Sequence, residues 1–291
     1  MRSPRWAFGS RLSAVGYRSP ARGVRVIPHG MAVVAALSIA SASPLTAQSK
    51  PLFTWEDGAL IAGFLAATAA IAPLDLSIAN RLQDSTVQEN RTLGRMATFV
   101  RTVADPGSVI IGVTLYTYGR LAKDENAADL GLHGTEALVV GAFSGTLLKG
   151  LFGRERPYVK RDPHDYKFGR GFGQERYRSF PSGHTIAAFA AASAVTSETR
   201  RWWPGSDWYI GPLMYGGAAA VGVSRIYNTR HWASDVVMGA AIGTMAGIKV
   251  VRYSHAHPQN AIDRWLLSGS ARRDAAGRWA VRWSVVPLLG R

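Results

Sequence analysis

Six apolar stretches, rich in alanine and glycine, occupy much of the chain between residues 55 and 255. Few of them alternate polar and apolar residues as strands do, which favours helices. They lie at about 58–73, 107–118, 136–148, 185–196, 209–223 and 236–251. Polar segments separate them, so the chain folds back between stretches. The sequence therefore predicts an all-α fold, a helical bundle of about six main helices.

Composition narrows the function classes. The chain has 291 residues, no cysteine and a formal net charge of +15. The absence of cysteine excludes disulfides, iron–sulfur clusters and a thiol nucleophile. With 47% hydrophobic and 18% charged residues, the chain is not of a disordered type. The positive charge favours an anionic partner: nucleic acid, an anionic membrane surface or a phosphorylated substrate.

Other elements are expected around these stretches. Residues 88–104 carry three arginines at helical spacing among apolar positions, which predicts an amphipathic helix. The segments 105–106 and 133–136 have residues typical of helix starts. Residues 158–180 are polar and contain glycine, so we expect a long loop. Alternation over 279–285 predicts a short β segment near the C-terminus.

The amino-terminal 47 residues have the order of a targeting segment. An arginine-rich start precedes an apolar run over 31–42, and small residues follow up to Ala47. This order is typical of a secretory signal peptide, with an N-terminal anchor as the alternative. We therefore expect a signal peptide or anchor over 1–47, the helical bundle over 48–253 and a C-terminal tail over 254–291.

Three short segments contain the residues that could perform chemistry. They are Lys149 with Arg156 and Pro157, then Pro181-Ser182-Gly183-His184, and then Ser224-Arg225 with His231 and Asp235. Two histidines, one carboxylate and three cations suit the transfer of a phosphoryl group. That reaction depends on positioning and on the stabilisation of charge.

The spacing of these residues is consistent with joint action. His231 and Asp235 are four residues apart, so on a helix they share one face. The carboxylate can then hold one ring nitrogen and leave the other free as a nucleophile or base. His184 follows Ser-Gly at an expected helix start, where backbone N–H groups bind anions. Arg156 and Arg225 can grip phosphate oxygens bidentately.

Chain order brings the segments to one end of an up-and-down bundle. Lys149 ends one expected helix, and His184 begins the next. Arg225 ends a third helix, and His231 begins a fourth. Since successive helices alternate in direction, these four points lie at the same end. We expect the active site there.

The whole pattern, K-x6-RP, PSGH and SR-x5-H-x3-D, resembles the signature of the type 2 phosphatidic acid phosphatase superfamily. That superfamily also includes bacterial acid phosphatases and vanadium haloperoxidases. The resemblance covers about residues 133–252. It implies a phosphatase that hydrolyses a phosphomonoester or pyrophosphate through a phosphohistidine intermediate. Lipid phosphates such as phosphatidic acid or undecaprenyl diphosphate are the substrates it favours.

The resemblance also implies a role for each residue. His231 is the nucleophile, Asp235 orients it, and His184 protonates the leaving oxygen. The residues implied to bind phosphate are Lys149, Arg156, Ser182, Gly183 and Arg225. Neither a metal nor another cofactor is implied. Pocket-shaping roles are expected for Tyr158, Phe180, Asn228 and Trp232, whereas His133, His164, His255 and His257 match no motif position and are interpreted as ordinary histidines.

Other functions remain open at this point. A vanadate-dependent haloperoxidase would use the same residues, because vanadate is an analogue of phosphate. A non-catalytic membrane protein would be expected to show gaps in the motif, and there are none. A nucleic-acid binder is disfavoured because the basic residues are dispersed and an export signal precedes them.

Location depends on whether the helices cross a membrane. No apolar stretch clearly reaches 18 uncharged residues, the usual length of a span. With a cleaved signal peptide, three crossings before Lys149 would also leave the site in the cytoplasm. We therefore expect an exported phosphatase, periplasmic or membrane-associated, with an integral inner-membrane protein as the close alternative. The expected partners are a phosphorylated lipid or small phosphoester and a membrane surface, and the oligomeric state is not predicted.

Overall fold

A computed structural model describes residues 51, 53–258, 260–263, 270–273 and 279–282. The targeting segment predicted for residues 1–47 lies outside these described residues. The described helices are α1 (Trp55–Ile71), α2 (Asp75–Leu82), α3 (Ser85–Gln88), α4 (Arg91–Thr102), α5 (Ser108–Ala122), α6 (Glu125–Phe152), α7 (Gly183–Trp202), α8 (Asp207–Tyr227) and α9 (Ala233–Ala256). Short helical turns lie at Ala72–Leu74, Val103–Gly107, Arg170–Phe172 and Glu175–Tyr177.

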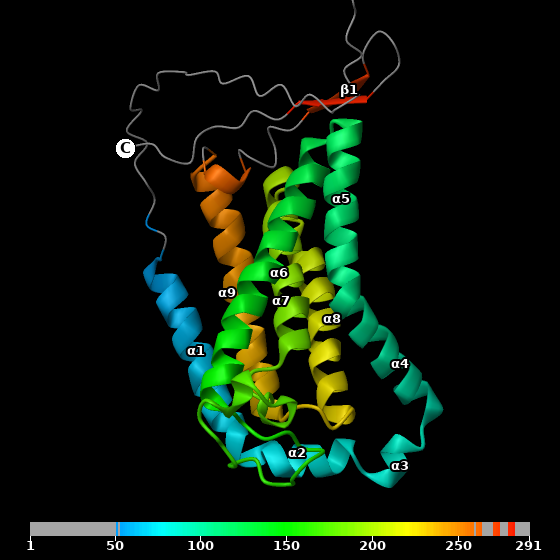
Figure 1. Cartoon of the computed structure of the whole chain (residues 1–291), viewed down its shortest axis with the longest axis vertical. Helices are drawn as coiled ribbons and strands as arrows, with labels where there is room; N and C mark the ends of the chain where they lie inside the picture. Colours follow the sequence, from blue (N-terminus) through cyan, green and yellow to red (C-terminus); the bar gives the residue numbers. More distant parts are fainter. Residues whose placement is uncertain (1–50, 52, 259, 264–269, 274–278, 283–291) are drawn as a thin grey trace, which may run out of the picture. The chain divides into compact units, whose positions relative to one another are not determined.

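The long helices run up and down through the bundle (Figure 1). α1 descends to the lower end, where the short helices α2 and α3 lie across it. α4 and α5 rise together, α6 descends, α7 rises, α8 descends and α9 rises. The all-α prediction is thus confirmed, and the helices predicted near 58–73, 107–118, 136–148, 185–196, 209–223 and 236–251 are the cores of α1, α5, α6, α7, α8 and α9.

One predicted boundary is wrong. Residues 133–136 do not start a helix, because α6 already begins at Glu125 and continues for 28 residues. Its N-cap is Asp124, whose carboxylate accepts a hydrogen bond of 3.1 Å from the backbone N–H of Ala127. The first two turns of α6 contain polar residues, so the apolar pattern begins later than the helix does. The amphipathic helix expected over 88–104 corresponds to α4.

Small residues explain how tightly the helices pack. A Cβ atom at Gly243 or Gly247 of α9 would collide with the backbone of α7. Similarly, a Cβ at Gly141 would lie 2.7 Å from the side chain of Ile186. The core between α6, α7 and α9 includes buried Ala137, Ala190, Ala194 and Ala246. Close approach of helix backbones through small residues is typical of bundles in membranes.

Three described helical segments are long and apolar enough to cross a membrane: Trp55–Leu82, Glu125–Phe152 and Ala233–Ala256. The expectation that the apolar stretches are too short is therefore wrong for these segments, since each helix extends beyond its uncharged run. Large apolar side chains also cover the outside of the bundle, among them Leu65, Val113, Val139, Phe143, Leu147 and Leu213. These are the features of a membrane protein.

The described C-terminal elements are short. Helix α9 ends at Ala256, and a further turn covers 261–263. Strand β1 (Ser270–Arg273) pairs antiparallel with β2 (Trp279–Arg282), with Ser270 opposite Arg282. The strand expected over 279–285 thus begins at the predicted residue, and its last three positions lie outside the described residues.

Candidate active site

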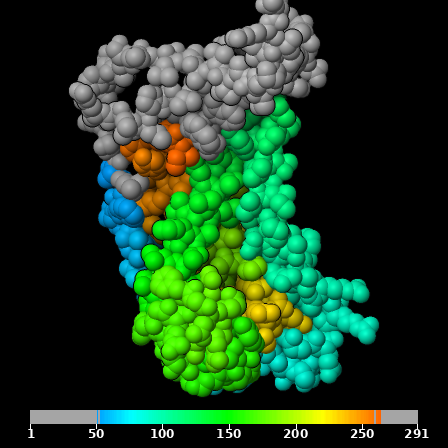
Figure 2. Space-filling model, viewed as in Figure 1, coloured from blue at the N-terminus to red at the C-terminus, as the bar shows by residue number. Residues whose placement is uncertain are grey.

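The three motif segments converge at the lower end of the bundle, around a cavity of about 200 Å³. The connection between α6 and α7, light green in Figure 2, bulges over this end. The cavity is lined by Arg101, Lys149, Arg156, Glu175, Gly183, His184, Arg225, Arg230 and His231. Six of the eight predicted site residues are in this lining. The other two, Ser182 and Asp235, are fully buried, and the N–H of Ser182 donates to the carbonyl of Asp235 at 3.0 Å.

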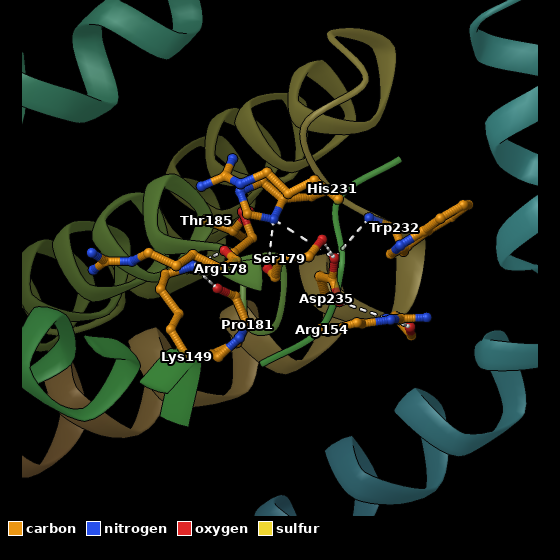
Figure 3. Close-up of polar contacts among 12 residues, drawn as sticks. Lys149, Arg154, Arg178, Ser179, Pro181, Thr185, His231, Trp232 and Asp235 are labelled. Atoms are coloured by element: carbon orange, nitrogen blue, oxygen red, sulfur yellow. Dashed lines mark hydrogen bonds and ion pairs between the residues drawn. The ribbon is translucent and has the colours of Figure 1, made fainter. Parts of the chain in front are cut away.

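His231 lies in the short loop between α8 and α9, and it is 2% exposed. Its Nδ1 is 2.7 Å from the carbonyl oxygen of Ser179 and 3.6 Å from Oδ2 of Asp235 (Figure 3). A carbonyl oxygen can only accept, so Nδ1 carries the proton of the neutral ring. The lone pair is then on Nε2, the nitrogen a nucleophile needs. The nearest atom that orients the ring is therefore a backbone carbonyl, with the predicted Asp235 carboxylate behind it.

Asp235 is itself held from three directions. Its Oδ2 accepts hydrogen bonds from the hydroxyl of Ser179 at 2.6 Å and from the backbone N–H of Trp232 at 2.8 Å. Its Oδ1 accepts from Arg154 at 2.6 Å (Figure 3). Three donors fix the carboxylate in one position and keep it ionised. Asp235 thus fixes the start of α9 to the part of the α6–α7 connection that contains Ser179, beside His231.

Arg154 joins the site to the amino-terminal part of the bundle. Its guanidinium is buried between Asp235 and Asp75, with a 2.8 Å hydrogen bond to the latter. Asp75, on α2, also accepts from the backbone N–H of Ser234 at 2.8 Å. The carbonyl of Pro163 accepts two further hydrogen bonds from Arg154, at 2.9 and 2.7 Å. One arginine therefore links α2, the α6–α7 connection and α9.

Burial lowers the pKa of His231 to about 3, and the nearby positive charges of Lys149 and Arg156 act in the same direction. The carboxylate of Asp235 opposes them but does not offset them. The imidazole is consequently neutral near neutral pH. A neutral ring is required for nucleophilic attack, because protonation would occupy the lone pair.

The rest of the cavity is strongly cationic. Lys149 Nζ donates to the carbonyls of Arg178, at 3.1 Å, and Pro181. Arg156 contacts Glu175 at 2.5 Å, and Glu175 is the one acidic residue in the described lining. Within the described residues, the buried Nε of Arg225 has no hydrogen-bond partner. Such a lining suits an anion with several oxygens and disfavours a metal cation.

His184 is in the first turn of α7, beside the cavity. Its side chain is 26% exposed, and its Nε2 lies 3.9 Å from the carboxylate of Asp105. The preceding Ser182 is the N-cap of α7, and its hydroxyl accepts a 2.8 Å hydrogen bond from Thr185. Backbone N–H groups at this helix start face the same end of the bundle as the cationic side chains. His184 is accessible to a substrate, as a proton donor must be.

Several residues of this site carry no motif signal. Arg101 and Arg230 line the cavity, Ser179 holds both His231 and Asp235, and Arg154 and Asp75 form the buried ion pair. Arg154 and Arg230 lie within or next to the motifs and could have been proposed on that ground. Asp75 and Arg101 are far away in sequence, and only the fold brings them near. Of the residues expected to shape the pocket, Trp232 is fully buried and donates from Nε1 to the carbonyl of Glu155 at 3.1 Å.

Together these features define a helical membrane bundle with a buried neutral histidine beside a phosphate-sized cationic cavity. Residues 132–258 match the PAP2 superfamily, and this segment includes every predicted site residue. The resemblance found in the motifs is therefore confirmed over this segment.

Known relatives agree with this assignment. A lipid A 1-phosphatase of Porphyromonas gingivalis is 48% identical over 69 residues, which are 24% of this chain and 15% of that protein. A lipid A 1-phosphatase of Rhizobium johnstonii is 34% identical over 106 residues, 35% of this chain and 39% of that protein. The similarity thus spans well under two thirds of each relative.

A solved structure shows the same fold. It is the first transmembrane PAP2 type phosphatidylglycerolphosphate phosphatase from Bacillus subtilis, with a TM-score of 0.51 and 21% identity. The similarity covers 69% of this chain and 97% of that chain. At this identity the comparison concerns the arrangement of helices alone.

Proposed function

We propose that this protein is a phosphatase that hydrolyses a phosphorylated membrane lipid through a phosphohistidine, without a metal at the reacting phosphate. The observation that carries the proposal is the neutral, buried His231, whose proton is on Nδ1 and whose ring lines the cationic cavity. The match to the PAP2 superfamily and the lipid A 1-phosphatase relatives support it.

The proposed reaction has two steps. Nε2 of His231 attacks phosphorus, forming the N–P bond while the ester P–O bond breaks. The leaving oxygen takes a proton from His184, acting as the general acid. Water then attacks phosphorus, the N–P bond breaks, and His184 accepts the water's proton. Phosphate leaves and both histidines return to their starting states, while Lys149, Arg156 and Arg225 stabilise the charge on the phosphoryl oxygens.

An apolar cavity beside α4 supports a lipid rather than a small ester. It has a volume of about 430 Å³ and is lined by residues of α4 to α8. α4 contributes Val100 to this apolar cavity and the adjacent Arg101 to the phosphate cavity. One helix therefore borders both cavities, as expected for a substrate with a phosphate head and a hydrocarbon tail.

Hydrolysis is tested with purified protein in EDTA, by measuring phosphate release from a lipid A 1-phosphate, phosphatidic acid, undecaprenyl diphosphate and a water-soluble phosphomonoester. We expect release from at least one lipid, inhibition by vanadate and complete loss with His231→Ala. Full activity of His231→Ala would refute the mechanism. No release from any substrate, together with vanadate-dependent halide oxidation, would assign the haloperoxidase reaction instead.

The structure also bears on orientation. Three upward or downward passes, α1, α4–α5 and α6, lie between Trp55 and Lys149, so the start of α1 and the site are at opposite ends (Figure 1). The family resemblance implies a site on the outer face of the inner membrane. This orientation requires α1 to start on the cytoplasmic side, which a cleaved signal peptide before α1 would not allow.

The native chain has no cysteine, so single cysteines report orientation without background. Lys160→Cys lies in the connection that covers the site, and Lys123→Cys lies in the turn between α5 and α6 at the other end. The cells are stripped of their outer membrane, their inner membrane is left intact, and a membrane-impermeant maleimide is added. If the site faces outward, the maleimide labels Lys160→Cys only. Labelling of Lys123→Cys only would place the site in the cytoplasm and support the signal-peptide prediction.

A further inference from the structure

A second group of ionisable side chains lies at the end of the bundle away from the phosphate cavity. His133 and Glu136 are in the upper part of α6, Glu198 is near the end of α7, and His255 is near the end of α9. Asp263 comes from the helical turn that follows α9. His133 and His255 match no motif position, and the proposed hydrolysis does not use this group.

Three atoms in this group are buried without a hydrogen bond to any described residue: Nε2 of His133, Oε1 of Glu136 and Oδ1 of Asp263. His133 is 2% exposed and Asp263 is 4% exposed. Each of the three residues offers a ligand atom within 4.8 Å of the others. The distance from His133 Nε2 to Asp263 Oδ2 is 3.6 Å, which is too long for a hydrogen bond. Buried polar atoms usually have a hydrogen-bond or ligand partner, so three converging ones point to a binding site.

The opposite side of the His133 ring is already held. Its Nδ1 lies 2.5 Å from a carboxylate oxygen of Glu198, which also contacts His255 Nε2 at 2.9 Å. An ionised carboxylate can only accept, so it holds the proton on Nδ1 and directs the lone pair of a neutral ring to Nε2. A carboxylate behind a histidine is the usual support of a metal-binding imidazole.

Charge favours a cation at this position. Glu136, Glu198 and Asp263 bring three carboxyl groups to one buried region, against two imidazoles. The basic residues of the same part of α9, Lys249 and Arg252, form ion pairs with Asp57 on α1. A divalent cation would balance the carboxylates and satisfy the three open atoms together.

We propose that this group binds a divalent transition-metal ion, best matched by zinc, through His133, Glu136 and Asp263, with Glu198 positioning His133. One imidazole and two carboxylates are suitable zinc ligands, and a fourth position remains for water. His133 and Glu136 are three residues apart on α6, so they project from one helix face. The ion would fasten the turn after α9 to α6, a structural role separate from hydrolysis.

Metal content gives the direct test. The full chain, purified in detergent through a tag without histidines, is analysed by inductively coupled plasma mass spectrometry. We expect about one zinc per chain, removable by EDTA, with a lower melting temperature after removal and recovery on adding Zn²⁺. At temperatures below the melting temperature of the metal-free protein, EDTA should leave hydrolysis unchanged, because the phosphate cavity lies at the opposite end of the bundle.

The variants distinguish this arrangement from its alternatives. His133→Gln, Glu136→Gln and Asp263→Asn should each weaken Zn²⁺ binding by more than about 100-fold, and Glu198→Gln by about 10- to 100-fold. His164→Gln is the matched control, because His164 is exposed in the connection at the phosphate end. Asp263→Asn decides the question if His133→Gln fails to fold.

Two outcomes would overturn the proposal. The first is wild-type protein without bound metal whose melting temperature does not respond to Zn²⁺. The second is equal Zn²⁺ affinity in Asp263→Asn and wild type, which would exclude these three ligands.

Discussion

Replacing Arg154 with methionine is the strongest test of how the site is held together. The side chain of Arg154 is 2% exposed, and its two carboxylate partners, Asp75 and Asp235, are both fully buried. Methionine has a similar length but neither charge nor donors. The substitution would leave two buried carboxylates facing each other without the cation that separates them, and the carbonyl of Pro163 without its donors.

The expected loss of stability is large. Breaking a buried ion pair by removing one partner costs about 3–5 kcal/mol, because the remaining charge stays desolvated. For a domain of this size, 1 kcal/mol changes the melting temperature by about 2–4 °C. We therefore expect Arg154→Met to melt about 6–20 °C below the parent protein. Arg154→Lys keeps the positive charge but lacks the planar guanidinium that contacts both carboxylates. Its melting temperature should therefore lie between those of Arg154→Met and the parent protein.

Thermal unfolding in detergent, followed by intrinsic tryptophan fluorescence, measures this effect. Arg161→Met is the matched control, since Arg161 belongs to the same connection but is exposed, and it should melt within about 2 °C of the parent. Adding Asp75→Asn to Arg154→Met removes one uncompensated charge and should recover part of the loss. An Arg154→Met protein that melts with the control would refute the assignment of this ion pair as the link between α2 and α9.

Three further predictions concern residues that line the phosphate cavity. His184→Ala should lower kcat most for substrates with poor leaving groups, measured by comparing an alkyl and a nitrophenyl phosphate; an equal loss on both would remove the general-acid role. Glu175→Gln should strengthen inhibition by inorganic phosphate several-fold, because the Glu175 carboxylate pairs with Arg156 and competes with phosphate for it. An unchanged inhibition constant would show that this contact does not compete. The pKa of His231 is about 3 in the folded protein and about 6.5 in the unfolded chain. As the pH falls, the unfolded chain therefore binds the proton first, and the free energy of unfolding decreases between about pH 6.5 and pH 3. His231→Gln should therefore lose less melting temperature than wild type between pH 7 and pH 4.5, and parallel curves would contradict the lowered pKa.

The sequence was sufficient to predict which end of the bundle holds the site. Lys149, His184, Arg225 and His231 each lie at or near a helix end, so alternation of helix direction brings them together whatever the details of packing. Local apolar runs likewise located the centres of α1 and of α5 to α9. Both inferences depend on residues close together in the chain, where periodicity and order carry the information.

Long-range partners were not predictable in this way. Asp75 accepts hydrogen bonds from Ser234, 159 residues later, and nothing around Asp75 in the sequence indicates that it faces α9. The length of α6 was also missed, because its polar first turns look like a loop when apolar residues alone are counted. His133 then falls in the middle of a helix and not at its start.

Contacts made by backbone atoms were also not predictable from the sequence. In this protein, the backbone of the α6–α7 connection holds several side chains of the site in place. Its carbonyl oxygens accept hydrogen bonds from His231 at Ser179, from Arg154 at Pro163 and from Lys149 at Arg178. Any residue supplies a carbonyl, so these contacts leave no mark on residue identity. They depend instead on the length and path of the connection. A change in the length of the connection should therefore displace His231, Arg154 and Lys149 together. Each of these side chains lies outside the connection or at its edge.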